Sequence, residues 1–178
     1  KNWEATWQGP GMAGSNSGVL EVSSLPPVDF GRRLKYLLTY PYGCVEQTTS
    51  AVFPQLYLED VMELKQEERE TIKKNILAGI ERLKLFLRPD GGFSYWPGVN
   101  ESDDWATSYA GHFLLEAEAR GYTIPAGFKP AWIRYQKAAA RDWTSVSGKY
   151  KYLAYQQSDL MQAYRLFTLA LAGSAEIG

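Results

Sequence analysis

The only cysteine of the 178-residue chain, Cys44, lies three positions before Gln47 in the stretch 42–47, Tyr-Gly-Cys-Val-Glu-Gln. One cysteine cannot form an intrachain disulfide and is too few for a structural zinc site. It can act as a nucleophile, lie inert in the core, or be consumed in a bond to a nearby side chain. The spacing favours the bond: a sharp turn would let the sulfur reach the Gln47 side-chain carbonyl, release ammonia and close an internal thioester.

The bland alternative is a buried, unmodified cysteine. Free cysteine is among the most often buried residue types and usually behaves as a small hydrophobe. A passive interaction module with such a cysteine is therefore one alternative function. A thiol hydrolase, with a reactive free Cys44, is another.

The flanks of the motif resemble a known family. Residues 34–47 are similar to the thioester segment of the alpha-2-macroglobulin and complement family, and Val45 with the following 48–50, Thr-Thr-Ser, resembles its bacterial members. Further stretches that resemble the same domain are Pro54, 56–58, 91–96 and 105–109. The resemblance covers most of residues 18–173 and favours the thioester over an inert cysteine.

The resemblance implies the thioester domain of a bacterial, protease-trapping alpha-2-macroglobulin. Cys44 and Gln47 would form the thioester, which would capture attacking endopeptidases by acyl transfer to amines, mainly lysine side chains. Such capture happens once per molecule, so the resemblance implies an inhibitor and not an enzyme, with no cofactor or metal. It also implies other domains in a longer parent chain, a periplasmic location and a lipid anchor on the parent.

A thioester reacts with water and amines, so aromatic side chains near it are expected to form a lid. The candidates are Tyr40, Tyr42, Phe93, Tyr95, Trp96 and Trp105. Tyr40 and Tyr42 are favoured because they lie on the reactive turn, whereas ordinary core packing explains Trp105 equally well. Gly43 is expected to permit the backbone conformation that joins sulfur and carbonyl. Glu46 is expected to cap the helix start or, as the alternative, to orient the turn.

Composition sets the protein class. Hydrophobic residues make up 45% and aromatic residues 14% of the chain, which is typical of a globular domain. A net charge of −1 argues against nucleic-acid binding, which needs clustered lysine and arginine. No apolar run approaches the roughly 20 residues that span a bilayer, and no signal peptide is recognisable, so direct membrane contact by this domain is not expected.

The pattern along the chain predicts an all-α fold. Residues 1–28 read as a linker or lead-in with one short strand at 18–24, and 29–178 as the thioester domain, truncated at its C-terminal end. Three similar apolar helices are expected to begin near 46, 104 and 159, with amphipathic helices at 68–87 and 129–142 between them. Alternating hairpins of this kind predict an α/α toroid, partial or complete, with the apolar helices inside.

This arrangement predicts one functional rim. The loops 39–46, 88–104 and 143–158 all precede inner helices, so they should gather on one face. The final inner helix lacks a following outer helix, which predicts an exposed apolar edge there. The loop 145–155 contains no histidine, and by the resemblance this favours transfer to amines over hydroxyl groups.

Two further alternatives involve other residues. A glycosidase or cyclase on the same helical toroid would need paired acids at the rim, and the candidates are Asp90, Glu101, Asp103 and Asp104. The only histidine, His112, could suggest a Cys–His dyad. It falls about two turns inside its helix, roughly 12 Å along the axis, whereas a dyad needs contact near about 3 Å. His112 is therefore expected to be a structural residue.

Overall fold

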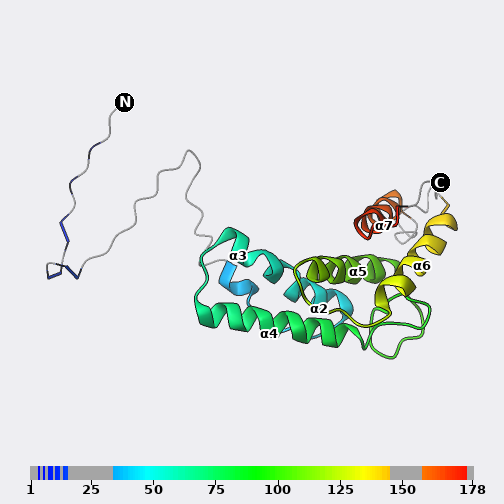
Figure 1. Ribbon diagram of the computed structural model, residues 1–178, viewed down its shortest axis with the longest axis horizontal. Helices are drawn as coiled ribbons and strands as arrows, with labels where there is room; N and C mark the ends of the chain where they lie inside the picture. Colours follow the sequence, from blue (N-terminus) through cyan, green and yellow to red (C-terminus); the bar gives the residue numbers. More distant parts are fainter. Residues whose placement is uncertain are drawn as a thin grey trace.

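The computed structural model describes residues 34–144 and 158–175, together with isolated positions between 4 and 15 (Figure 1). The α-helices of these residues are α2 (Val45–Val52), α3 (Leu58–Val61), α4 (Gln66–Leu83), α5 (Asp104–Ala119), α6 (Phe128–Arg141) and α7 (Asp159–Leu171). Two 3-10 helices, η1 (Lys35–Leu37) and η2 (Pro54–Tyr57), lie on either side of α2. Among the described residues, strand-like pairing is limited to isolated bridges of Phe93 with Leu87 and Asp103, so the all-α class is confirmed.

Parts of the predicted organisation lie outside the described residues. These are the strand at 18–24, most of the lead-in 1–28 and the loop 145–155. The division of the chain at residue 28 therefore stays a prediction.

The three predicted inner helices are α2, α5 and α7, and they begin at residues 45, 104 and 159 as expected. Each is capped by the side chain of the preceding residue. Cys44, Asp103 and Ser158 accept hydrogen bonds from the backbone N–H groups of Gln47, Ala106 and Met161. Such caps satisfy backbone N–H groups of the first turn, which have no acceptor within the helix. Because a cap involves only neighbouring residues, the starts of these helices could be predicted from the local sequence.

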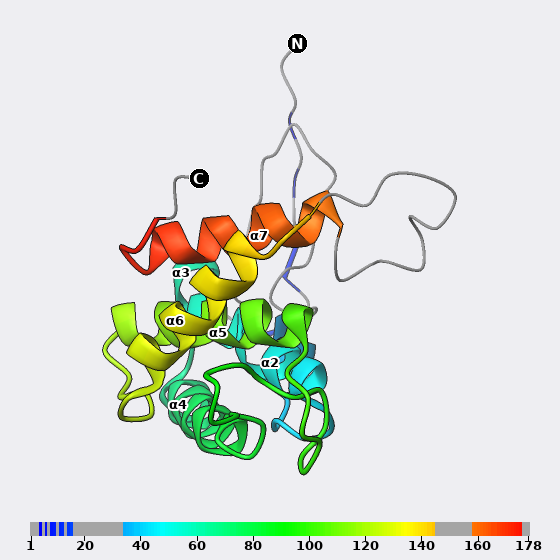
Figure 2. The same ribbon diagram turned by 90° about the vertical axis from the view of Figure 1, so that its right-hand side faces the viewer.

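The inner helices form a row. α2 packs against α5, and α5 packs against α7. The intervening amphipathic helices cover the row: α4 packs on α2, and α6 packs on α5 and α7. Figures 1 and 2 show α5 in the middle, with α4 on one side and α7 on the other. This is the alternating-hairpin arrangement predicted from the sequence. The helix expected at 68–87 ends at Leu83, because the chain turns over residues 84–86.

Close helix packing depends on small residues in the apolar helices. A Cβ at Gly111 of α5 would lie 2.2 Å from Nε1 of Trp132, which is fully buried on α6. That Nε1 donates a hydrogen bond of 2.8 Å to the Thr107 carbonyl. A Cβ at Gly79 of α4 would lie 2.8 Å from Val52 of α2. These approaches fix α4 and α6 against the inner row.

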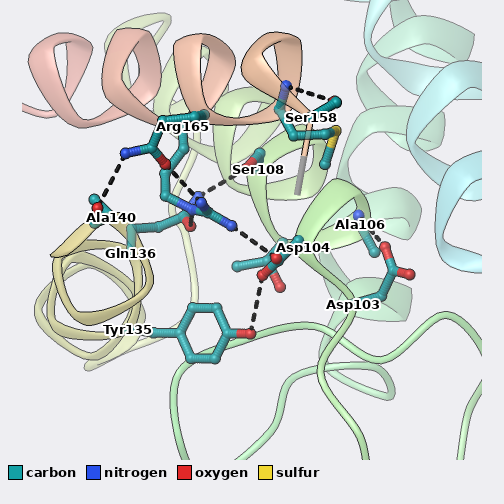
Figure 3. A network of polar contacts seen from close by, with 12 residues as sticks. Asp103, Asp104, Ala106, Ser108, Tyr135, Gln136, Ala140, Ser158 and Arg165 are labelled. Atoms are coloured by element: carbon teal, nitrogen blue, oxygen red, sulfur yellow. Dashed lines mark hydrogen bonds and ion pairs between the residues drawn. The ribbon is translucent and has the colours of Figure 1, made fainter. Parts of the chain in front are cut away.

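A buried polar network ties α7 to the same scaffold (Figure 3). Arg165 is 1% exposed; its Nε donates to Gln136 Oε1 on α6 at 3.2 Å. Its Nη2 lies 2.9 Å from Asp104 Oδ2 in the first turn of α5, an ion pair without hydrogen-bond geometry. Tyr135 donates a long hydrogen bond of 3.4 Å to the same carboxylate. A buried cation needs such partners, so this network sets how α7 sits on α5 and α6.

The outward side of α7 is apolar and exposed. Among the described residues, this helix carries three exposed large hydrophobic side chains, those of Leu160, Phe167 and Leu171. The predicted apolar edge at the last inner helix is therefore confirmed.

Candidate thioester site

The Cys44 turn is built as a reciprocal cap at the start of α2. The Cys44 sulfur accepts a hydrogen bond of 3.5 Å from the Gln47 backbone N–H. In return, the Cys44 backbone N–H donates 3.0 Å to Gln47 Oε1. This is the capping-box geometry with cysteine in place of serine or threonine. It holds the thiol and the Gln47 side chain at the same helix end, and thioester closure requires that these two groups be neighbours.

The cap also prepares the carbonyl for nucleophilic attack. The N–H of Cys44 points at Oε1, where negative charge would develop if a nucleophile added to the side-chain carbon. The first turn of a helix adds partial positive charge at the same place. Cys44 is a free thiol with 4% of its surface exposed, whereas Gln47 is exposed. The Gln47 side chain is thus open to solvent while the Cys44 sulfur is sheltered.

Gly43 is required by this turn for two separate reasons. Its φ is +87°, a left-handed conformation that favours glycine. A Cβ there would lie 2.0 Å from Gln47 Oε1 and 2.9 Å from Cδ. Any larger residue would therefore displace the carbonyl itself, which supports the role expected from the sequence.

Arg82, near the end of α4, holds the turn from outside, and sequence reasoning missed it. Its Nη2 donates 2.8 Å to the Gly43 carbonyl, and its Nε donates 3.2 Å to Thr48 Oγ1. The guanidinium lies 5.8 Å from the centre of the Phe86 ring. The only local signal was a basic residue near a helix C-terminus, which is common for reasons of helix stability.

Arg82→Ala should loosen the reactive turn. Two charge-assisted hydrogen bonds would be lost, and we expect the free energy of unfolding to fall by about 1–3 kcal/mol. The thioester, where present, should hydrolyse severalfold faster because its carbonyl is less firmly placed. Thermal unfolding and the rate of thiol appearance in buffer measure the two effects.

Lys74→Ala is the control for Arg82→Ala, since it removes an exposed cation from the same helix. Equal rates of thiol appearance in the two variants would show that Arg82 does not position the turn.

The predicted meeting of the first two loops at one rim is confirmed. The Tyr95 carbonyl accepts a hydrogen bond of 3.2 Å from the Val45 N–H, and the Tyr95 hydroxyl donates 2.7 Å to Glu46 Oε2. The pKa of Tyr95 is raised, first because of the bond to Glu46, then because of its interaction with the Cys44 side chain and its burial. A pocket of about 400 Å³ opens here, lined by Cys44, Glu46, Gln47, Ser50, Tyr95 and Trp96.

The remaining lid candidates lie in different surroundings. Tyr40 and Tyr42 are 58% and 64% exposed on the reactive turn, and Trp96 is 51% exposed at the pocket. Phe93 is buried in the core. Trp105 stacks on Tyr109 at 5.4 Å and is not among the residues that line the pocket. Its link to the site is indirect, through Tyr109, whose hydroxyl lies 3.1 Å from Ser50 Oγ.

His112 belongs to a separate cluster on the inner helices. Its Nδ1 lies 2.9 Å from the Tyr164 hydroxyl, and its ring packs edge-on against Phe53 and Phe167. Burial lowers the pKa of His112, although the nearby Glu116 opposes this effect. The contacts of this ring are with other residues than Cys44, in agreement with the structural role expected for it.

Three of the four acids considered for a glycosidase or cyclase have structural partners, and the fourth, Glu101, is exposed. Asp90 accepts hydrogen bonds from Ser102 and from the Gly92 N–H. Asp103 caps α5, and Asp104 pairs with the buried Arg165. These partners give Asp90, Asp103 and Asp104 structural roles.

Within 34–144 and 158–175 no group of His, Cys, Asp and Glu is arranged to hold a metal ion. The described helices also include none long and apolar enough to cross a membrane.

The comparisons with known proteins agree with the geometry. A family model described as the A-macroglobulin TED domain matches residues 22–162. The alpha-2-macroglobulin of Escherichia coli K12 is 37% identical over 112 residues, which cover 61% of this chain and 7% of that protein. The Xylella fastidiosa Temecula1 alpha-2-macroglobulin is 28% identical over 176 residues, covering 94% of this chain and 10% of that protein. The chain thus spans a small part of the length of these relatives.

Solved structures give the same result. Native E. coli alpha-2-macroglobulin, from domain MG7 to the C-terminus, superposes with a TM-score of 0.64 at 29% identity, covering 85% of this chain and 24% of that one. Salmonella alpha-2-macroglobulin reacted with methylamine gives a TM-score of 0.61 at 29% identity, with 85% and 10% covered. The chain belongs to the A-macroglobulin TED domain family, as found in bacterial alpha-2-macroglobulins.

Proposed function

We propose that this chain is the thioester domain of a protease-trapping alpha-2-macroglobulin, and that Cys44 and Gln47 form its thioester. The observation that carries the proposal is the reciprocal cap, in which the Cys44 N–H donates to Gln47 Oε1 while the Cys44 sulfur accepts from the Gln47 N–H. Loss of ammonia from Gln47 would convert this pair into a thioester with the carbonyl oxygen still held by the same donor.

The proposed reaction is single-use capture. An amine of an attacking endopeptidase adds to the Gln47 side-chain carbon, the carbon–sulfur bond breaks, and the protease remains attached through an amide while Cys44 becomes a thiol. Support comes from relatives described as activated by trypsin and by porcine elastase, and from one reacted with methylamine. Because the domain is consumed, it acts as an inhibitor without turnover. We place the parent protein in the periplasm, with a lipid anchor, by analogy with the bacterial family.

An intact-mass measurement on the freshly isolated parent protein tests the proposal. We expect a mass one ammonia below the sequence mass, and no titratable Cys44 thiol. Methylamine should then release one thiol and leave a methylamide on Gln47. A full equivalent of free thiol with no ammonia deficit would exclude the thioester and favour the passive module or the thiol hydrolase.

Tyr40→Ala and Tyr42→Ala test the aromatic lid. Both side chains lie exposed on the reactive turn, where they can cover the exposed Gln47 side chain or bind a covering domain of the parent. We expect thiol to appear several times faster in buffer without a change in helical content. The outcome that rejects a lid formed by these tyrosines is an unchanged rate for both variants.

Tyr36→Ala is the matched control here, since Tyr36 is also exposed but precedes the reactive turn. Its rate of thiol appearance should equal that of the unmodified protein.

A further inference from the structure

The pocket beside Cys44 contains a carboxylate and a phenol that the thioester cap does not use. Glu46 and Tyr95 come from different elements, the first turn of α2 and the loop before α5, and they are joined by a hydrogen bond of 2.7 Å. Both line the 400 Å³ pocket together with Cys44 and Gln47. A nucleophile that approaches the Gln47 side-chain carbon through this pocket would therefore pass the Glu46–Tyr95 pair.

The position of Tyr95 is fixed at two points. Its backbone carbonyl accepts from the Val45 N–H at 3.2 Å, and its hydroxyl donates to Glu46. The bond to Glu46 is the largest cause that raises the pKa of Tyr95, and the neighbouring Cys44 side chain raises it further. The phenol is therefore held on a carboxylate in the same pocket that Cys44 lines, and the Cys44 sulfur is the group that would leave.

We propose that Glu46 and Tyr95 form a proton relay for aminolysis of the thioester, an inference that rests on the proposed function. An amine adds to the Gln47 side-chain carbon, forming the carbon–nitrogen bond, and the carbon–sulfur bond breaks. The nitrogen loses one proton to the Glu46 carboxylate. Tyr95 donates its hydroxyl proton to the Cys44 sulfur and takes the proton held by Glu46, so an amide, a thiol and the original carboxylate–phenol pair remain.

If the relay operates, its contribution to the rate of aminolysis should depend on the basicity of the amine. After a strongly basic amine adds, thiolate is the better leaving group and departs without help. After a weakly basic amine adds, the amine itself is expelled again unless its proton is removed and the sulfur is protonated. General acid–base catalysis contributes about 10²–10⁴-fold where proton transfer limits the rate, so loss of the relay should affect weakly basic amines most.

The experiment compares ethylamine with 2,2,2-trifluoroethylamine, which has a similar skeleton and much weaker basicity. Thiol release is followed in the parent protein and in its Tyr95→Phe and Glu46→Gln variants. Phenylalanine removes the proton donor and keeps the ring, whereas glutamine keeps an oxygen that can accept from Tyr95 but cannot take up a proton at neutral pH. We expect each variant to slow the trifluoroethylamine reaction about tenfold or more and the ethylamine reaction less than about threefold.

Tyr57→Phe is the matched control. Tyr57 donates a hydrogen bond of the same length, 2.7 Å, to Glu116, and neither residue lines the pocket. This variant should react as the unmodified protein does with both amines. A purely structural role of Tyr95 would slow both amines equally.

Each result decides the proposal. Equal slowing of both amines, or no slowing in either variant, overturns the relay while leaving the thioester function intact. Failure of both variants to form the thioester also overturns it, because Glu46 and Tyr95 would then build the turn instead of moving protons. Absence of the thioester from the unmodified parent overturns the proposed function, and the relay with it.

Discussion

Heating the protein should break its chain at one peptide bond, between Glu46 and Gln47. In an intact thioester the side-chain carbonyl carbon of Gln47 is activated toward nucleophiles. The backbone nitrogen of the same residue can attack this carbon. The attack expels the sulfur and closes a five-membered pyroglutamyl ring. The Glu46–Gln47 peptide nitrogen is then acylated twice, which weakens the bond, so water cleaves it. In the structure this nitrogen lies only 3.5 Å from the Cys44 sulfur, at the centre of the cap.

Denaturing gel electrophoresis and mass spectrometry of the fragments measure this cleavage. We expect most of the thioester-bearing chains to break on heating, with Gln47 recovered as an N-terminal pyroglutamyl residue. Methylamine pretreatment and Cys44→Ala should each abolish the cleavage, since either removes the activated carbonyl. Fragments that persist after both treatments would come from ordinary hydrolysis and would contradict the thioester.

Gly43→Ala should eliminate the thioester. Alanine is sterically disfavoured at φ +87°. Its Cβ would also lie 2.0 Å from Gln47 Oε1, the oxygen that accepts the hydrogen bond from the Cys44 N–H. The Gln47 side chain would have to leave its position, which separates the carbonyl from the sulfur. We expect the ammonia deficit and the methylamine-released thiol to be absent, and the unfolding free energy to fall by at least about 1–2 kcal/mol from backbone strain alone.

Gly121→Ala separates these two effects. Gly121 has nearly the same φ, +86°, and a Cβ there would meet nothing within 4 Å. This variant should therefore show the stability loss and keep the thioester. If Gly43→Ala keeps a full complement of thioester, the turn does not depend on the close approach of Gly43 to Gln47.

The sequence by itself determined the helices and the reactive turn. Cys44, Asp103 and Ser158 cap three inner helices whose starts were predicted from local pattern, because caps and helical periodicity involve residues only a few positions apart. The same locality applies to the thioester, since Cys44 and Gln47 lie three positions apart and meet within one helical turn.

Only the tertiary structure decided what surrounds this turn. Arg82 reaches the Gly43 carbonyl across 39 positions, and Tyr95 reaches Glu46 across 49. From the sequence, Tyr95 was expected only as part of a lid, and no local pattern distinguished Arg82 as a site residue. Trp105, whose role near the thioester stays a prediction, stacks on Tyr109 and lies tilted against Tyr164 of α7. Such contacts depend on how α2, α4 and the loop before α5 pack together, and packing is set by the whole core, whereas a cap is set by its own few residues.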